Sequence, residues 1–106
     1  MQSIIQDDST YCFLDGKNGH GDPLEKHHVF FGVSNRQHSE EDGLTVWLCG
    51  DNCHRNGKKS AHRCNETNRY LKRKAQTAWE LKRQQSGMTP EEARKAFIAR
   101  YGKSEL

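Results

Sequence analysis

Two groups of residues in this chain have the types and spacing of metal ligands. His27 and His28 are adjacent at the start of an apolar run, and further along the chain Cys49 and Cys53 flank a turn that ends in His54. Imidazole nitrogens and thiolates are ligands that zinc and related divalent ions prefer. A neutral histidine also accepts a proton near pH 7. The combination predicts a bound metal ion with a base beside it.

The two adjacent histidines should have different roles. Consecutive residues of a strand point to opposite faces, so His27 and His28 cannot easily share one ion. Hydrolysis of a phosphodiester needs activated water, a neutralised phosphate and a stabilised leaving oxygen. A divalent ion serves the last two needs and a neutral histidine the first. His62 could reach the same site as His54 if the intervening loop folds back.

The cysteines predict a second, structural metal site. A Cys pair in a tight turn is typical of a zinc knuckle, although Cys49 and Cys53 have three residues between them instead of the usual two. Cys12, in a Gly-rich loop, could supply a third thiolate. Cys64 and Asp15 are both candidates for the fourth ligand. The alternatives are four unrelated reduced thiols or a disulfide pair.

Short apolar runs and turn signals predict the elements that must position these residues. We expect strands from His28 to Val33 and from Leu44 to Leu48, with one helical turn at 39–42 that Gly43 ends. A long helix is predicted from about Cys64 to Gln85. A further helix should follow the capping box at Thr89.

Two apolar stripes predict how the helices pack. In the long helix one narrow stripe contains Leu71, Ala75, Ala78 and Trp79. The last helix presents Ala93, Phe97, Ile98 and Tyr101 on one side, and we expect these residues to pack onto the strands.

Length and composition predict one small domain that needs a metal. The chain has 106 residues, of which 32% are hydrophobic and 29% charged. A domain with so small a hydrophobic core usually needs a bound metal ion or disulfide bonds to be stable. No apolar run approaches the roughly 18 residues of a membrane span, which predicts no membrane association. The first residues also lack the pattern of a signal peptide. We therefore expect a cytoplasmic protein with reduced thiols.

The net charge of +3 hides an asymmetry along the chain. Residues 1–54 carry three basic and nine acidic side chains, whereas residues 55–83 carry ten basic and two acidic ones. Such a basic block is typical of a surface that binds a polyanion. A solvated helix face is an equally good interpretation of the charge alone.

Several short motifs together resemble the HNH endonuclease family, whose core is the ββα-metal motif. The resemblance is closest to small phage-encoded or prophage-encoded HNH proteins, and it covers roughly residues 12–80. The matching motifs are His27-His28-Val29-Phe30-Phe31-Gly32, Ser34-Asn35-Arg36, Gly43-Leu44-Thr45-Val46-Trp47-Leu48-Cys49, Cys53-His54-Arg55 and Ala61-His62.

The resemblance implies a small α+β fold, and a role for each matching residue. The single domain, residues 1–106, would have a ββα-metal core at about 12–83 with a zinc knuckle, and an additional C-terminal helix at about 90–101. His28 would be the general base and Asn35 would orient it. The active-site ion, Mg²⁺, Mn²⁺, Ni²⁺ or Zn²⁺, would be held by His27, His54 and His62. The structural zinc would be held by Cys12, Cys49 and Cys53, with Cys64 or Asp15.

The resemblance also implies a nucleic-acid partner. In such nucleases the helix after the second strand lies against DNA, and here we expect phosphate contacts from Arg55, Arg69, Lys72 and Arg73. Of these, Arg69, Lys72 and Arg73 should share one helix face. Contacts to the DNA backbone give affinity with little sequence preference.

The predicted function is a metal-dependent DNA endonuclease with weak sequence preference, and a homodimer could cut both strands. The alternatives are a non-catalytic, zinc-stabilised nucleic-acid-binding module and a phage protein that binds a host protein. The basic helix favours the first two functions over the third. An unliganded His28 beside a metal favours the nuclease over the binding module.

Overall fold

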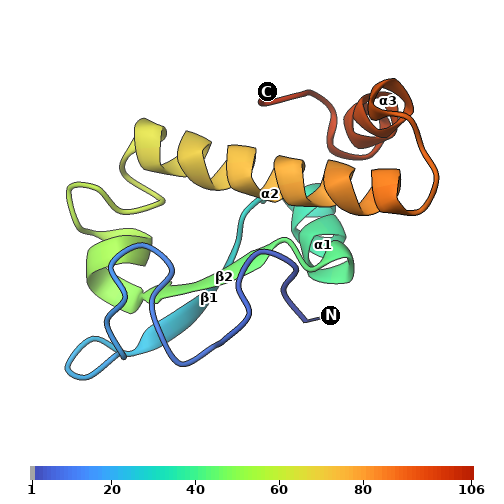
Figure 1. The fold of residues 1–106 in the computed structure, drawn as a ribbon. Helices are drawn as coiled ribbons and strands as arrows, with labels where there is room; N and C mark the ends of the chain where they lie inside the picture. Colours follow the sequence, from blue (N-terminus) through green and yellow to red (C-terminus); the bar gives the residue numbers. More distant parts are fainter. Residues whose placement is uncertain (1) are drawn as a thin grey trace.

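A short two-stranded sheet, one long helix and two shorter helices form a small α+β fold in the computed structural model, which describes residues 2–106 (Figure 1). The element order along the chain is β1 (Leu24–His28), α1 (Val33–Asp42), β2 (Thr45–Cys49), the wide helical turn η1 (Gly50–Arg55), α2 (Asn65–Gln85) and α3 (Pro90–Tyr101). Within this described part no helix is long and apolar enough to cross a membrane.

The sheet is antiparallel and its register pairs His27 with Val46 and His28 with Thr45. β2 lies one residue from the strand predicted at 44–48, and Leu44, Val46 and Leu48 are all fully buried. These three side chains belong to one core with Leu71 and the other apolar residues of α2, which runs across the sheet (Figure 1).

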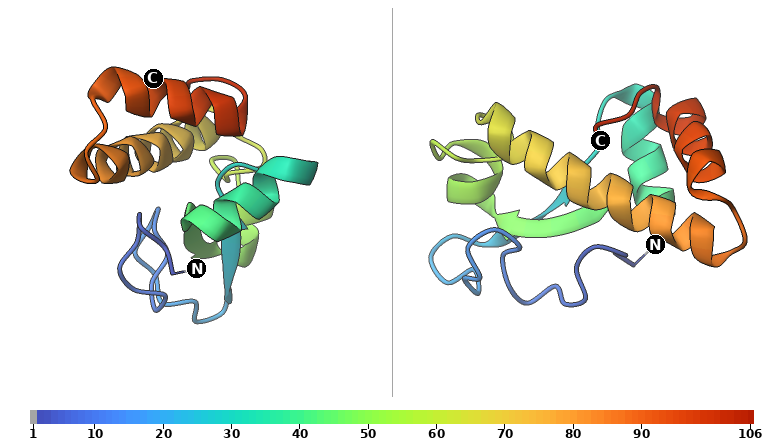
Figure 2. Two further views of the ribbon diagram at one scale, coloured as in Figure 1. Left: turned by 90° about the vertical axis from the view of Figure 1, so that its right-hand side faces the viewer. Right: turned by 45° about the horizontal axis from the view of Figure 1, so that its top comes forward.

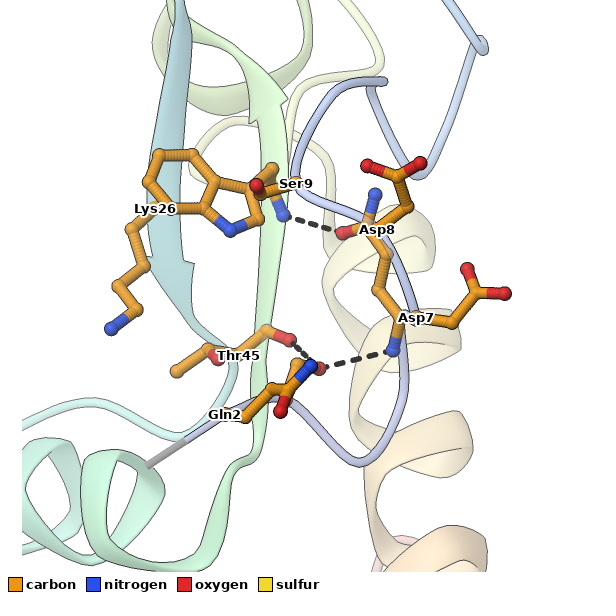
Figure 3. Close-up of a pocket in the computed structure, with 9 residues that line it drawn as sticks. Gln2, Asp7, Asp8, Ser9, Lys26 and Thr45 are labelled. Atoms are coloured by element: carbon orange, nitrogen blue, oxygen red, sulfur yellow. Dashed lines mark hydrogen bonds between the residues drawn. The ribbon is translucent and has the colours of Figure 1, made fainter.

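The N-terminal segment covers the edge of β2. Phe13 N donates to Trp47 O at 2.8 Å, and Trp47 N donates to the side chain of Gln6 at 2.7 Å. Figure 3 shows the hollow of about 330 Å³ on this side, with Asp7 and Asp8 opposite Thr45 and Lys26. The hydrogen bonds of this segment use the backbone of β2, whereas β1 pairs with β2 alone.

The first strand lies earlier in the chain than predicted: it ends at His28, the residue at which the predicted strand begins. β1 covers Leu24–His28, and the apolar residues Val29 and Phe30 lie in a buried connection instead. Gly32, with a φ of 103°, precedes α1, which runs for ten residues where one turn was expected. Tertiary packing overrides the β propensity of this run, since the Phe30 ring packs edge-on against Phe97 and at a tilt against Tyr101, both in α3. The predicted stop at Gly43 is confirmed, with a φ of 73°.

The two later helices lie close to their predicted positions. α2 ends at the predicted Gln85, and both hydrogen bonds of the Thr89 capping box are present. Of the predicted stripe, Leu71, Ala75 and Trp79 are buried, and Ala78 is partly exposed.

The prediction that the last helix packs onto the strands is wrong. α3 packs on α2 and α1, at the end of the molecule away from η1 (Figure 2). Phe97 packs edge-on against Trp79, and Ile98 is largely exposed. Asp42 at the end of α1 accepts hydrogen bonds from Trp79, Arg100 and Tyr101, which joins the three helices. The core face of the sheet is already occupied by α2, so α3 has to pack elsewhere.

Candidate metal centres

Three histidines from separate segments converge on one point. His27 lies in β1, His54 in η1 and His62 in the loop before α2. Each offers a ring nitrogen within 4.8 Å of those of the other two. The ring centroids are 5.0, 5.3 and 4.7 Å apart for the pairs 27–54, 27–62 and 54–62. The three residues predicted to bind one ion are thus brought together.

His27 is the buried member of this cluster. It is only 2% exposed, and its Nε2 atom is buried without a hydrogen-bond partner. Burial, followed by the neighbouring rings of His54 and His62, lowers the pKa of His27 to about 3. A neutral imidazole with an unpartnered buried nitrogen, facing two other imidazoles, fits a metal ligand.

His54 is oriented by a carboxylate that the sequence reasoning missed. Its Nδ1 lies 2.9 Å from Oε1 of Glu25, and the other oxygen of Glu25 accepts from Arg55 at 3.0 Å. A carboxylate on one ring nitrogen directs the other nitrogen to a metal. The available signal was spacing, since Glu25 and His27 are two residues apart in a strand and share a face.

His62 reaches the cluster because the loop before α2 folds back on η1, as the sequence analysis required. Ala61 N donates to Cys53 O at 2.7 Å, and His62 N donates to His54 O at 3.1 Å. These two bonds lay the end of the loop alongside the end of η1. Burial, followed by His54 and Arg55, lowers the pKa of His62.

A second cluster combines three buried cysteines with one carboxylate. Cys12, Asp15, Cys49 and Cys53 each place a ligand atom within 4.8 Å of the others. The thiols of Cys49 and Cys53 donate to Asp15 at 3.3 to 3.5 Å. Burial, followed by Cys12 and Asp15, raises the pKa of Cys49 to about 12. Such a group could hold a metal ion, and thiolates with a carboxylate are ligands that zinc accepts.

Cys64, which the sequence analysis grouped with the other cysteines, is not part of this cluster. It precedes α2 as its N-cap residue, and its carbonyl accepts from Asn68 N. The loop that brings His62 to the histidine cluster carries Cys64 onto the start of the helix. Of the two alternatives left open for the fourth ligand, Asp15 is the residue in place.

His28 lies outside the three-histidine cluster and contacts a glutamate. Its Nε2 lies 3.0 Å from Oε1 of Glu40, which also accepts from Lys26 Nζ at 3.0 Å. These two contacts, His28 first, lower the pKa of Glu40 to about 2.

The predicted partner of His28 lies elsewhere. Asn35 donates its side-chain amide to Tyr101 O at 3.1 Å, because α1 turns that side towards α3. The structure thus pairs His28 with Glu40 from the last turn of α1, not with Asn35. A glutamate in a run of acidic residues gave no sequence signal for this pairing.

One cleft of about 300 Å³ contains both the histidine cluster and His28. Three cations from different elements line it: Lys26 of β1, Arg36 of α1 and Arg55 of η1. Phe31 forms part of its wall, 5.7 Å from the His62 ring. The cleft therefore offers metal ligands and a further imidazole beside three cations, of which Lys26 and Arg55 pair with Glu40 and Glu25.

The basic residues predicted to share an open face of α2 are only partly free. Arg69 is exposed. The Lys72 side chain is 19% exposed, because Nζ lies 5.3 Å from the Phe31 ring centre and 4.0 Å from a Glu105 oxygen. Arg73 donates to Glu105 O at 3.3 Å. Lys72 is therefore not a freely exposed cation, since residues 104–105 fold back along α2 and Gln76 holds them there. The phosphate contacts of these residues stay a prediction.

No known protein family model matches the chain, and comparisons with curated proteins and with solved structures likewise found no match. The two clusters make the chain a candidate metal-binding protein on the geometry of its own residues.

Proposed function

We propose that this protein is a metal-dependent endonuclease of the HNH type that hydrolyses phosphodiester bonds in DNA with weak sequence preference. The observation that carries the proposal is the convergence of His27, His54 and His62 in the same cleft that contains His28. A site that only stored or carried a metal would have no need of the fourth histidine.

The three clustered histidines would hold the active-site ion, Mg²⁺, Mn²⁺, Ni²⁺ or Zn²⁺. When bound there, a divalent ion supplies charge neutralisation at the phosphate and stabilisation of the leaving oxygen. Neutral ring nitrogens add no negative charge to the cleft, and the lowered pKa of His27 keeps that ring neutral. The site therefore stays attractive to a phosphate.

His28 would act as the general base. It belongs to the cleft but not to the histidine cluster, so its ring remains available for proton transfer. A positioned histidine can take the proton of an attacking water at neutral pH.

The cations of the cleft would hold the DNA backbone. Lys26, Arg36 and Arg55 line the space beside the histidines, and Arg69 extends the positive surface along α2. Phosphate contacts carry no base information, which supports weak sequence preference.

The Cys/Asp cluster would be a structural zinc site. Its ligands come from the N-terminal loop, the end of β2 and η1, so a zinc there would tie the N-terminal loop to the end of the strand. Cys53 and His54 are neighbours in η1, so a zinc there would also fix the backbone of an active-site ligand. Metal binding and folding are coupled in small domains of this kind.

A plasmid-cleavage assay tests the proposal. Supercoiled plasmid is incubated with the protein and added Mg²⁺, Mn²⁺, Ni²⁺ or Zn²⁺, with chelator as the blank. His28→Ala should lower the cleavage rate by about 10² to 10⁴-fold at unchanged DNA affinity. The matched control is His20→Ala, an exposed loop histidine outside both clusters, which should cleave like the parent.

Each outcome of this assay has a distinct meaning. If the parent protein does not cleave the plasmid with any of the four ions, the proposed nuclease function is wrong. Metal-independent DNA binding without cleavage would favour the non-catalytic binding module instead. Linear plasmid as the first product, in place of the nicked circle, would support a homodimer that cuts both strands.

A further inference from the structure

His28 is held in place by a residue from the segment between the strands. Nε2 of His28 lies 3.0 Å from Oε1 of Glu40, and the His28 side chain is 15% exposed. Glu40 belongs to the last turn of α1, and His28 is the last residue of β1. The pair is thus twelve residues apart in sequence and meets across the connection.

The backbone around Glu40 is fixed relative to His28. The neighbouring Ser39 is fully buried, and its hydroxyl donates to Phe30 O at 2.7 Å while it accepts from Phe30 N at 3.1 Å. This two-way bond attaches the last turn of α1 to the chain two residues after His28. Gly43 then ends the helix in a left-handed conformation. Glu40 therefore approaches His28 from a rigid support.

Two histidines of the cleft have glutamate partners, but on opposite ring nitrogens. Glu25 contacts Nδ1 of His54, whereas Glu40 contacts Nε2 of His28. A carboxylate accepts an N–H, so the nitrogen across the ring carries the lone pair. For His54 that nitrogen is Nε2, a candidate metal ligand. For His28 it is Nδ1.

We propose that Glu40 is the positioning residue of His28, holding the proton on Nε2 and presenting Nδ1 as the atom that accepts a proton. The inference rests on the proposed nuclease function. The Nδ1 lone pair takes one proton from the attacking water, and the water oxygen forms a bond to phosphorus. The bond from phosphorus to the leaving sugar oxygen breaks, and that oxygen keeps the electron pair and takes up a proton from solvent.

Lys26 completes the arrangement. Its Nζ lies 3.0 and 3.1 Å from the two oxygens of Glu40. The ammonium group offsets a carboxylate that would otherwise repel the phosphates of a bound DNA strand. The Glu40 carboxylate thus stays next to His28, and its pairing with Lys26 limits the repulsion of a bound phosphate.

The test compares Glu40→Gln and Glu40→Ala with the parent in metal-replete cleavage assays. The control is Glu41→Gln, the adjacent glutamate, which pairs with Arg100 on the side of α3. Loss of a positioning partner typically lowers activity by about 10 to 100-fold. We expect a fall of that size in kcat for Glu40→Ala and a smaller one for Glu40→Gln, whose amide oxygen can still accept the N–H. Glu41→Gln should match the parent.

The Michaelis constant separates positioning from general damage. Removal of a negative charge beside the cleft should leave KM for DNA unchanged or lower it. A lower kcat at unchanged or lower KM, in variants with the parent's melting temperature, is therefore the expected signature. An unchanged kcat in folded, metal-replete Glu40→Ala overturns the inference while the proposed function stands.

A second measurement does not depend on activity. In protein that holds the structural zinc but no ion at the histidine cluster, a carboxylate-bound Nε2–H of His28 should give a protected imidazole proton signal by ¹⁵N-edited NMR, absent from His28→Ala. The signal should be lost to solvent exchange in Glu40→Ala and kept in Glu41→Gln. Its persistence in Glu40→Ala would overturn the Glu40–His28 pairing. A parent that shows the protected proton but never cleaves DNA would instead refute the proposed function, and with it the base role of His28.

Discussion

The two clusters differ in how many ligands the protein supplies. The Cys/Asp cluster offers four donors, the number that completes the tetrahedral shell of zinc, so a metal there has no position left for a substrate. The histidine cluster offers three, and its His62 is exposed to the cleft. A closed site suits stability and an open one suits chemistry. We infer from this difference that a metal in the Cys/Asp cluster would help to build the site at the histidine cluster.

The turn η1 links the two clusters physically. Cys53 belongs to the first cluster and His54, the next residue, belongs to the second. Both residues also accept backbone hydrogen bonds from the loop that carries His62. A disturbance of the closed site should therefore reach the open site, whereas loss of the open site should leave the closed one intact.

The largest expected effect comes from removing the closed site. Cys53→Ser should abolish zinc binding and cooperative unfolding, because a structural zinc contributes on the order of 10 kcal/mol and small domains have only about 5–15 kcal/mol of stability. We expect one zinc ion per chain that resists mild chelation in the purified parent and none in the variant. Elemental analysis and thermal melts by circular dichroism would measure both.

The remaining cysteine and the carboxylate provide the controls for that prediction. Cys64→Ser lies outside the cluster and should keep the zinc content and melting temperature of the parent. Asp15→Cys would supply a fourth thiolate and should hold zinc against a chelator at least as well. A Cys53→Ser protein that melts like the parent without zinc would show that the closed site has no structural role.

A smaller effect is expected from Glu25, which supports the open site without belonging to it. Glu25→Gln removes the charge that fixes His54 and should weaken metal binding at the histidine cluster by about 10 to 100-fold. The structural zinc and the fold should be unaffected. Titration of zinc-loaded protein with Ni²⁺ or Mn²⁺ by calorimetry measures the loss.

Glu66→Gln is the matched control for Glu25, since it neutralises an exposed carboxylate in the first turn of α2, outside both clusters. It should bind the added ion like the parent. Equal affinity in Glu25→Gln and the parent would mean that the geometry of His54 does not need the carboxylate.

The comparison of the clusters also shows what a sequence can predict. Ligand type and local spacing predicted that Cys49 and Cys53 would lie together, and the structure places both in one cluster, because a tight turn brings neighbours together whatever the rest of the fold does. Cys64 was as suitable chemically as Asp15. Only the path of the loop after η1 decides between them, and that path depends on backbone bonds to Cys53 and His54.

The supporting carboxylates were missed for a similar reason, although the strand spacing of Glu25 and His27 gave a signal for Glu25. Glu25 and Glu40 meet histidines that are 29 and 12 residues away. The helical turn predicted at 39–42 contained Glu40. The run after His28 was predicted as a strand, however, so nothing indicated that Glu40 would face His28. The apolar run is buried because Phe30 packs against α3, a long-range contact that no local sequence pattern predicts.

The smallest effect expected concerns the basic surface beside the open site. Arg69 and Arg73 are both exposed, but Arg73, like the partly buried Lys72, contacts Glu105. If Arg69 meets one phosphate, Arg69→Gln should lower the salt dependence of DNA binding by about 0.9 in the log–log slope. Binding should weaken equally for unrelated DNA sequences, and stability should barely change.

The control Lys95→Gln, an exposed cation of α3, should keep the parent's slope. Fluorescence anisotropy at several salt concentrations measures both variants. Equal slopes for Arg69→Gln and the parent would move the DNA surface away from α2 and leave the cleft cations Lys26, Arg36 and Arg55 to hold the phosphates alone.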